Sequence, residues 1–515
     1  MSGLKSLSRR SFLKGSALLG AGIVGSASIT ACASKAYADS VAWDRETDVL
    51  VVGSGFAGYS AALYAHDAGA EVVLIDKRGS DGGNSLKCDG DFGVCGSSAQ
   101  KEHGIEDSVD AYVNDMLVAG LYLNDVEKCR TIAESTNGIY EWLNDLGVTW
   151  VQDGEGKTEV LPYGGHTIRR TLKAEGAGAA IVGALRNEAN AKGLAAECHL
   201  LLTELVKNDE GRVIGAKVVK NNETQERSDS PHGQCINIKA RKGVVLATGG
   251  FGGDVAWRMQ HDPRLDETVG DTNRSGANRE ALEPALHADA LAVHMDWIQL
   301  GPWCSPDLET YGPDGTYIDA GFPYGPVVAP QTGKRIVNEL TDRKRYCDAI
   351  LANEEPLIQI VDERNLPEWS LEYLEKCIDA GCTWRMDSIE EIAERFDIPL
   401  EALQTEIARY NTFVANKLDE DFGKAIPEDA LPVEEPPYCV TRVWPRVHHC
   451  MGGVKTDADC RVIDVSLQPI EGLFAAGEAT GGVHGACRLG SCSIADCLVN
   501  GSLAGQNAAQ AESWC

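Results

Sequence analysis

The sequence predicts an α/β fold: a Rossmann-like, discontinuous dinucleotide-binding domain with an inserted α+β capping domain. A glycine-rich turn follows the first strand-like run, and two further strand-like runs that end in glycine turns appear much later, near residues 244 and 472. At 515 residues the chain is also too long for one simple core. The expected parts, in order, are a leader at 1–38, the first domain at 39–300, the capping domain at 301–430, and the rest of the first domain at 431–515.

The leader has the features of an export signal. Arg9 and Arg10 lie in the run SRRSFLK and precede a short apolar stretch, a pattern typical of twin-arginine signals. Cleavage after an A-x-A site ending at Ala38 is the preferred interpretation. The alternative is a lipobox-like sequence that would leave a lipid anchor on Cys32. We therefore expect a protein exported in folded form, to the periplasm or the outer face of the cell membrane.

The chain after the leader is strongly acidic. Residues 1–38 contain five basic residues and no acidic ones, so removing them moves the net charge from −30 to −35. This charge argues against nucleic acid and anionic membrane surfaces as partners. The 17 cysteines form neither C-x-x-C nor C-x-x-C-H, which excludes covalent c-type haem. No metal site is predicted, and an iron–sulfur cluster remains a minor alternative to buried free thiols.

A nucleotide-binding site is predicted at the start of the mature chain. The apolar run Val49–Val52 leads into the sequence GSGFAG at 53–58. Gly53 allows a tight turn, Gly55 allows a pyrophosphate to approach the backbone, and Gly58 allows close helix–strand packing. The second strand, 72–75, ends at Asp76, which can hold a ribose hydroxyl beside Lys77.

Three further stretches favour FAD over NAD. They are the glycine-rich loop at 82–85, the strand with an A-T-G-G end at 244–250, and the strand with an A-A-G-E end at 472–478. Such a set spans the whole chain, as expected when one discontinuous domain wraps an extended FAD. Non-covalent FAD is predicted, because no histidine lies near Asn84 to attach it. From these stretches the expected cofactor contacts are Gly83, Asn84, Ser85, Gly90, Thr248, Gly249 and Glu478.

Three motifs carry a resemblance to a known family. They are HHCMGG at 448–453, GEATGGVHGACRLG at 477–490, and RIVNELTDR at 335–343. With them, residues 46–510 resemble the soluble fumarate reductase and flavocytochrome c flavoproteins, a family that includes urocanate reductases and is distantly related to ketosteroid dehydrogenases. The resemblance implies FAD-dependent reduction of a carbon–carbon double bond next to a carboxylate. The family's haem domain is absent, so we expect a separate electron donor, a cytochrome or another membrane-linked carrier.

The resemblance also implies roles for individual residues. Arg343 takes the position of the proton donor, and Arg488 and His448 take positions that clamp the substrate carboxylate. His449 is expected to face the flavin, with Ser493 and Ile494 among the cofactor contacts. In the same charged run as Arg343, the side chains of Arg335, Lys344 and Arg345 are expected at the surface.

The sequence departs from the family where the substrate binds. The family's Q-x-H appears as Gln299-Leu300-Gly301, so the histidine for a second carboxylate is missing. The relay glutamate and arginine fall near Asp319 and Phe322. Gln299 and Asp319 are expected to contact the substrate, with His448 and Arg488. These departures favour a larger monocarboxylate, such as an aryl acrylate or a urocanate-like acid, used in anaerobic respiration. The alternative is a ketosteroid dehydrogenase-like or reductase-like enzyme acting on a steroid enone.

Several aromatic residues lie in or near the predicted capping domain. They either line the substrate pocket or belong to an ordinary core, and the sequence leaves both interpretations open. The residues are Trp297, Trp303, Phe322 and Tyr324.

Overall fold

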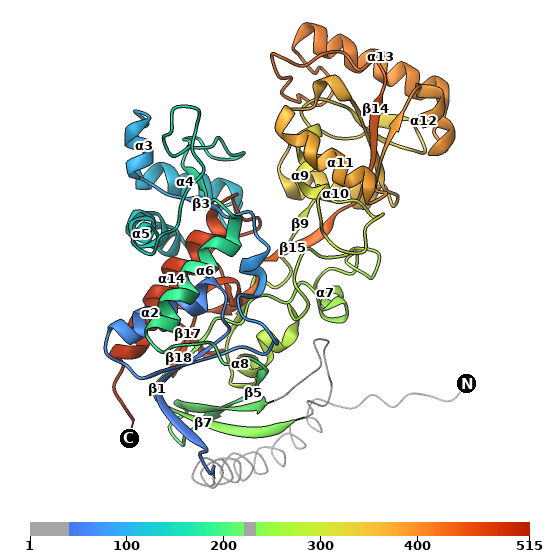
Figure 1. Ribbon diagram of the computed structural model, residues 1–515. Helices are drawn as coiled ribbons and strands as arrows, with labels where there is room; N and C mark the ends of the chain where they lie inside the picture. Colours follow the sequence, from blue (N-terminus) through green and yellow to red (C-terminus); the bar gives the residue numbers. More distant parts are fainter. Residues whose placement is uncertain (1–40, 221–232, 515) are drawn as a thin grey trace, which may run out of the picture.

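The computed structural model of the protein describes residues 41–220 and 233–514. Within them the largest sheet has seven strands, in the order β17-β18-β7-β1-β2, with β6 and β5 added beside β7 (Figure 1). β1 pairs in parallel with β2 and β7, and β7 pairs in parallel with β18 from the carboxy-terminal part of the chain. One sheet thus combines both ends of the chain, which confirms the discontinuous α/β domain. The strands are β1 (Arg45–Val52), β2 (Val72–Ile75), β5 (Leu200–Lys207), β6 (Val213–Lys220), β7 (Gln234–Leu246), β17 (Arg461–Ile463) and β18 (Pro469–Ala475).

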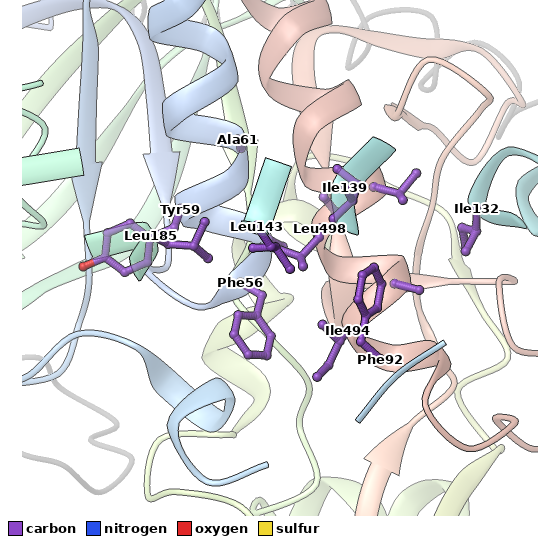
Figure 2. Close-up of a cluster of buried hydrophobic side chains, with 14 of the residues drawn as sticks. Phe56, Tyr59, Ala61, Phe92, Ile132, Ile139, Leu143, Leu185, Ile494 and Leu498 are labelled. Atoms are coloured by element: carbon purple, nitrogen blue, oxygen red, sulfur yellow. The ribbon is translucent and has the colours of Figure 1, made fainter. Parts of the chain in front are cut away.

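The helices α2 (Phe56–Asp67) and α14 (Cys492–Gln510) pack closely against each other at the centre of this domain. A Cβ atom at Gly505 would lie 2.1 Å from the carbonyl oxygen of Ala61, so only glycine permits this approach. Figure 2 shows the apolar side chains that surround the helix pair, among them Phe56 and Leu498. The pair fixes the glycine turn at the start of α2 against the rest of the domain.

The remaining elements of this domain include two long helices, α5 and α6, which contribute side chains to the same core, and several shorter segments. They are η1 (Gly83–Leu86), β3 (Asp91–Gly93), α3 (Ser98–Glu102), α4 (Val109–Ala119), α5 (Val126–Asp145), β4 (Thr171–Lys173), α6 (Ala177–Ala191), α7 (Val255–His261), η2 (Arg279–Ala281), α8 (Glu283–His287), β8 (Ala292–Val293), β16 (Gly453–Lys455), η5 (Gly477–Ala479) and β19 (Thr480–Gly481).

The capping domain is built on a second sheet of five strands, in the order β11-β10-β12-β14-β13. Strand β14 lies between β12 and β13 and pairs with both, so the sheet extends past residue 430, where the sequence placed the end of this domain. Its elements are α9 (Asp314–Gly321), β10 (Val327–Ala329), β11 (Lys334–Arg335), α10 (Arg343–Ala352), β12 (Leu357–Asp362), η3 (Glu363–Asn365), η4 (Glu368–Ser370), α11 (Leu371–Asp379), β13 (Thr383–Met386), α12 (Ile389–Arg395), α13 (Leu400–Asn416) and β14 (Tyr438–Val443).

Two paired strands join the domains. The chain enters the cap after β9 (Ile298–Gly301) and returns through β15 (Arg446–Cys450), and the two strands pair antiparallel (Figure 1). In this register Gln299 lies opposite His449. Helix α10 packs against the pair, since Cys347 shares a buried cluster with Leu300 and Val447. Three segments that carry predicted site residues therefore meet at the junction of the domains.

The surface location predicted for Arg335 is wrong. Its side chain is completely buried and forms two hydrogen bonds to Glu339, at 2.8 and 2.7 Å, and one to Asp419 at 2.9 Å. The charged run folds back on itself, and an acid from a distant loop completes the pairing. Arg345, by contrast, is 76% exposed.

Candidate functional site

A cleft lies at the carboxyl ends of the parallel strands. The residues that follow β1, β2, β7 and β18 line it, which is where open α/β sheets bind their ligands. Ten of the residues predicted to bind the cofactor line this cleft: Gly53, Gly55, Asp76, Lys77, Gly83, Asn84, Ser85, Thr248, Gly249 and Glu478. Among its lining residues that the sequence did not suggest are Arg274 and Ser275, from the loop before η2, and Glu280, from η2 itself.

The glycine turn has the close contacts that its sequence predicts. Gly53 has a φ of +101°, and a Cβ there would lie 2.2 Å from the carbonyl oxygen of Ala247. At Gly58 a Cβ would lie 1.8 Å from the carbonyl oxygen of Gly53, so this glycine serves helix packing and does not line the cleft. The backbone N–H of Phe56 donates to Oγ of Ser85 at 3.0 Å, which holds the second glycine loop against the first.

Asp76 also has a structural task within the turn. Its Oδ2 accepts hydrogen bonds from the backbone N–H of Ser54 at 3.0 Å and from Oγ of Ser54 at 2.5 Å. Its Oδ1 accepts one from the backbone N–H of Arg78 at 2.9 Å. The carboxylate therefore shapes the turn as well as facing the cleft. Lys77 beside it donates to Asn278 at 2.7 Å and pairs with Glu280 at 3.1 Å.

Four other predicted cofactor residues lie away from the cleft lining. Gly90 has a φ of +79° and approaches the backbone of Ala177, where a Cβ would lie within 2.8 Å. Ser493 and Ile494 stand in the first turn of α14, and the side chain of Ile494 belongs to the domain core. At Ser493 and Ile494 it is therefore the backbone N–H groups, which have no partner within the helix, that can reach a ligand. The fourth residue, His449, is buried in β15.

The junction of the domains holds a set of buried polar atoms without a partner. They are Nε2 of His449, Oε1 of Gln299, Nε of Arg488 and Nη1 of Arg343. Leaving such a group buried and unpaired costs about 1–3 kcal/mol, so four in one region indicate that ligands supply the partners. The glycine-lined cleft fits an extended dinucleotide cofactor, and the unpaired atoms at the junction are available to that cofactor or to a substrate.

The predicted clamp residues come together at this junction. Burial lowers the pKa of His448 well below its ordinary value, and the charges of Arg488 and Arg343 lower it further. His448 is therefore neutral near pH 7, and its Nδ1 shares a hydrogen bond of 2.9 Å with Oγ1 of Thr272. Arg488 is 8% exposed, and burial and Arg343 lower its pKa as well. Two cationic groups and one neutral imidazole face a common space, an arrangement suited to a carboxylate.

Glu478 and His449 form a second titratable pair at the inner end of the cleft. Oε1 of Glu478 accepts a hydrogen bond of 2.9 Å from the backbone N–H of Cys450 and lies 3.7 Å from Nδ1 of His449. Burial raises the pKa of Glu478 to about 7. Burial lowers the pKa of His449 well below its ordinary value, and the charge of Arg488 adds to this effect. Near pH 7, His449 is therefore neutral, and Glu478 is protonated in part of the molecules.

Of the four aromatic residues left open by the sequence, Trp303 belongs to the site. The guanidinium carbon of Arg343 lies 4.4 Å from the centroid of its indole, and the His448 ring meets it edge-on at 5.5 Å. A Cβ at Gly301 would lie 3.0 Å from Cζ2 of Trp303, so the indole fills the room beside that glycine. Phe322 instead packs on Tyr346 at 5.2 Å in the cap core.

Other residues near Arg343 were not suggested by the sequence at all. Asp89 and Tyr163 come from the first domain and lie near enough to Arg343 for its charge to act on both groups. The hydroxyl of Tyr163 donates a hydrogen bond of 2.6 Å to Oδ2 of Asp91. Asp319, predicted near the substrate, keeps part of its surface exposed, but neighbouring atoms desolvate its carboxyl group. This desolvation raises the pKa of the carboxyl, the charge of Arg343 opposes the rise, and the charge of Asp89 adds to it.

Metal and membrane features were searched over the same described ranges. There, no group of three or more His, Cys, Asp and Glu side chains is arranged to hold a metal ion. No described helix combines the length and apolar character needed to cross a bilayer.

Comparison with known proteins places the chain in a family. Residues 48–494 match the FAD binding domain family. The chain is 36% identical to the acrylate reductase flavoprotein subunit of Shewanella woodyi, over 99% of this chain and 100% of that protein. It is 33% identical to the urocanate reductase of Eggerthella lenta, over 90% of this chain and 75% of that protein. Its fold matches the open conformation of a flavocytochrome c3 fumarate reductase with a TM-score of 0.76 and 31% identity, over 92% of this chain and 80% of that one. The chain therefore belongs to the FAD-binding flavoproteins of the fumarate reductase type, and it is an FAD-dependent oxidoreductase that acts on CH–CH bonds.

Proposed function

We propose that this protein reduces the carbon–carbon double bond of an α,β-unsaturated monocarboxylate. The observation that carries the proposal is the meeting of Arg343, Arg488 and His448 beside the FAD cleft, with unpartnered nitrogen atoms on both arginines. Such a space holds one carboxylate. The indole of Trp303 occupies the adjoining position, next to Gly301, where a side chain for a second carboxylate would otherwise stand.

Each residue has a task that its position supports. FAD, when bound, supplies the hydride equivalents for the β carbon of the double bond. Arg488, with its planar fork of donors, and neutral His448 hold the carboxylate and stabilise the negative charge that grows toward it. A well-placed donor of this kind is worth about 3–4 kcal/mol in the transition state. Arg343 delivers the proton to the α carbon, and the face of Trp303 keeps its guanidinium in place.

Two of the three relatives reported above are named for monocarboxylic substrates, and the third is named for fumarate, a dicarboxylate. Acrylate and urocanate, which appear in the names of the two relatives above, are both monocarboxylic enoates. An aryl acrylate or a urocanate-like acid extends the same reacting group by an aromatic ring. The indole of Trp303 beside Arg343 and His448 supports a substrate that carries an aromatic ring.

We further propose that the enzyme works outside the cytoplasm and uses its substrate as a terminal electron acceptor in anaerobic respiration. The support is the twin-arginine pattern in the leader, which lies outside the described residues, as does Cys32 with its alternative lipid anchor. Electrons then come from a separate carrier, a cytochrome or another membrane-linked protein.

Reoxidation of the reduced flavin tests the reaction. The FAD-loaded protein is reduced with dithionite under anaerobic conditions and mixed with acrylate, cinnamate, urocanate, fumarate or a steroid enone while the flavin absorbance is followed. We expect rapid reoxidation by monocarboxylic enoates and slow reoxidation by fumarate. Response to the steroid enone alone would favour the ketosteroid type of enzyme and reject the proposal.

Arg343→Ala provides the second arm of the test. Loss of the proton donor is expected to slow reoxidation by about 10²–10⁴-fold while FAD stays bound. Arg345→Ala, two residues along the same helix and 76% exposed, is the matched control and should keep the wild-type rate. Equal rates for both variants would remove Arg343 from the reaction.

A further inference from the structure

The turn that carries Arg488 into the junction is held by hydrogen bonds from two separate segments. The carbonyl oxygen of Arg488 accepts one of 3.1 Å from Nε2 of Gln299 in β9. The carbonyl oxygen of Gly490 lies 2.9 Å from Nε2 of His166, which belongs to the first domain. Because these two anchors are two residues apart, together they fix the backbone from which the Arg488 side chain projects.

The proton on His166 is assigned by the partner of its other ring nitrogen. Nδ1 lies 2.8 Å from Nη1 of Arg170, and a guanidinium only donates hydrogen bonds. Nδ1 must therefore accept, so the neutral ring carries its proton on Nε2 and donates it to Gly490. Burial lowers the pKa of His166, the bond to Gly490 opposes this effect, and the charge of Arg170 adds to it.

Arg170 is itself fixed in one orientation. Its side chain is fully buried, and its Nε and Nη2 donate to the two oxygens of Asp107 at 2.9 and 3.0 Å. Its Nη1 donates to Oδ2 of Asp115 at 2.5 Å, and its guanidinium carbon lies 4.6 Å from the ring centroid of Tyr112. A planar fork held at three points has a defined direction for each N–H group. The imidazole of His166 therefore receives its hydrogen bond from a fixed donor.

The residue after Gly490 shows how strongly the first domain determines this turn. Ser491 is not a glycine, yet its φ is +58°, a left-handed conformation that such residues seldom adopt. Its Oγ lies 2.9 Å from Oγ1 of Thr171 and 3.3 Å from Nε2 of His166. Its carbonyl oxygen accepts a hydrogen bond of 3.0 Å from the backbone N–H of Gly93. A conformation of this kind persists only where its surroundings impose it.

The loop before His166 also packs against the turn. A Cβ at Gly490 would lie 2.5 Å from Cδ1 of Tyr163, and a Cβ at Gly165 would lie 2.8 Å from Cδ1 of Leu489. The two segments thus touch at residues on either side of the hydrogen bond. An apolar side chain at position 166 would keep this packing and lose the bond, so the two contributions can be measured separately.

We propose that His166, fixed by Arg170, is a positioning residue that aims the Arg488 side chain at the substrate carboxylate. This inference rests on the proposed function, in which Arg488 holds that carboxylate. His166 acts through the carbonyl group of Gly490 and not by contact with the substrate. A displacement of about 1 Å in a group that binds the substrate can cost about 10²-fold in rate, so a hydrogen bond behind the turn can affect the reaction.

The test measures carboxylate binding and turnover in FAD-loaded His166 variants. The substrate is whichever of acrylate, cinnamate and urocanate the wild type reduces, with reduced methyl viologen as the electron donor. Calorimetry gives the Kd of the matching saturated acid, which is propionate, 3-phenylpropionate or imidazolepropionate. His166→Leu loses the bond to Gly490, so Kd and KM should each rise about tenfold. His166→Gln can place an amide N–H where Nε2 lies, and both values should stay within about threefold of the wild type.

Two controls separate positioning from a general loss of structure. Nε2 of His103 also lies 2.9 Å from a backbone carbonyl oxygen, that of Thr158, so His103→Leu removes a contact of the same kind and should leave Kd and KM unchanged. Arg488→Lys cannot form the planar fork, and in this background His166→Leu should change Kd by less than about threefold. Flavin content checks that each variant is folded, since a smaller folded fraction lowers the apparent kcat but not Kd.

The outcomes separate this inference from the proposed function. Unchanged Kd and KM in His166→Leu would overturn the inference and leave the enoate reductase intact. An equal loss in His166→Gln would assign the effect to ring packing, and an equal loss in the Arg488→Lys background would show that His166 does not act through Arg488; either result also overturns it. Failure of every enoate to reoxidise the flavin would refute the proposed function, and this inference with it.

Discussion

Trp303 should control the reactivity of Arg343 without touching the flavin cleft itself. The indole lies 4.4 Å from the guanidinium carbon of Arg343 and meets His448 edge-on at 5.5 Å. Trp303→Leu keeps an apolar side chain but removes the π face. A cation–π contact is worth about 0.5–1 kcal/mol when exposed and about 2 kcal/mol when desolvated, and Nη1 of Arg343 is buried. A loss of about 1–2 kcal/mol corresponds to about a 5–30-fold fall in turnover.

The assay is kcat with the best enoate and saturating reduced viologen, together with the flavin content of each variant. Trp303→Phe retains an aromatic face and should lose less than Trp303→Leu. Trp384→Leu is the matched control, because Arg395 stacks on Trp384 at 4.3 Å in the other core cluster of the cap. A Trp303→Leu enzyme within about twofold of the wild type would refute the positioning role, as would an equal loss in Trp384→Leu.

Three further substitutions test other parts of the molecule. Arg335→Met should lower the free energy of unfolding in urea by about 3–5 kcal/mol, because it leaves the buried Glu339 and Asp419 unpaired. Arg345→Met, the control, should change the free energy of unfolding by less than about 0.5 kcal/mol. Similar values for the two variants would contradict the buried network. The pKa of Glu478 is raised from an ordinary 4.5 to about 7, so between these pH values the folded protein keeps a proton that the unfolded chain has released. The free energy of unfolding should therefore fall by about 3 kcal/mol as the pH rises from 4.5 to 7. Glu478→Gln should remove this slope from unfolding curves measured between those pH values, and an unchanged slope would assign it to another group. Gly58→Ala should lose most of its FAD, because the new Cβ would lie 1.8 Å from a carbonyl oxygen; the ratio of flavin to protein absorbance measures this loss. Gly138→Ala, with open space around the new Cβ, should keep its full FAD content. A full FAD content in both variants would show that the turn can relax.

Local patterns predicted the first domain well. The apolar runs before Gly53 and Asp76 are β-strands, and the second has the predicted bounds, because buried parallel strands read as continuous apolar segments. The glycine spacing also predicted contacts that only a packed structure can show, such as the approach of Gly58 to Gly53. These features depend on neighbours along the chain, which a single sequence contains.

Features that depend on distant partners were missed. Arg335 looked like a surface charge because its partner Asp419 comes from a loop far along the chain. The strand β14 joins the cap sheet only through pairing with β12 and β13, so its membership could not be read from its own residues. Asp91 and Tyr163 lie 72 positions apart, and neither belongs to a motif. Their contact is a property of the fold.

The pairing of β9 with β15 has a mechanical consequence for the enzyme. The two covalent connections to the cap form one ribbon, and α10 rests against that ribbon through Cys347. Gln299, His448 and the start of α10 at Arg343 thus lie near the axis about which the cap would swing. Because atoms near a rotation axis move least, such a rotation would displace the far end of the cap most. Arg343 and His448 would change little in their distance from each other. Such motion would open and close the space around Arg343 and His448, while these two groups keep their places relative to each other.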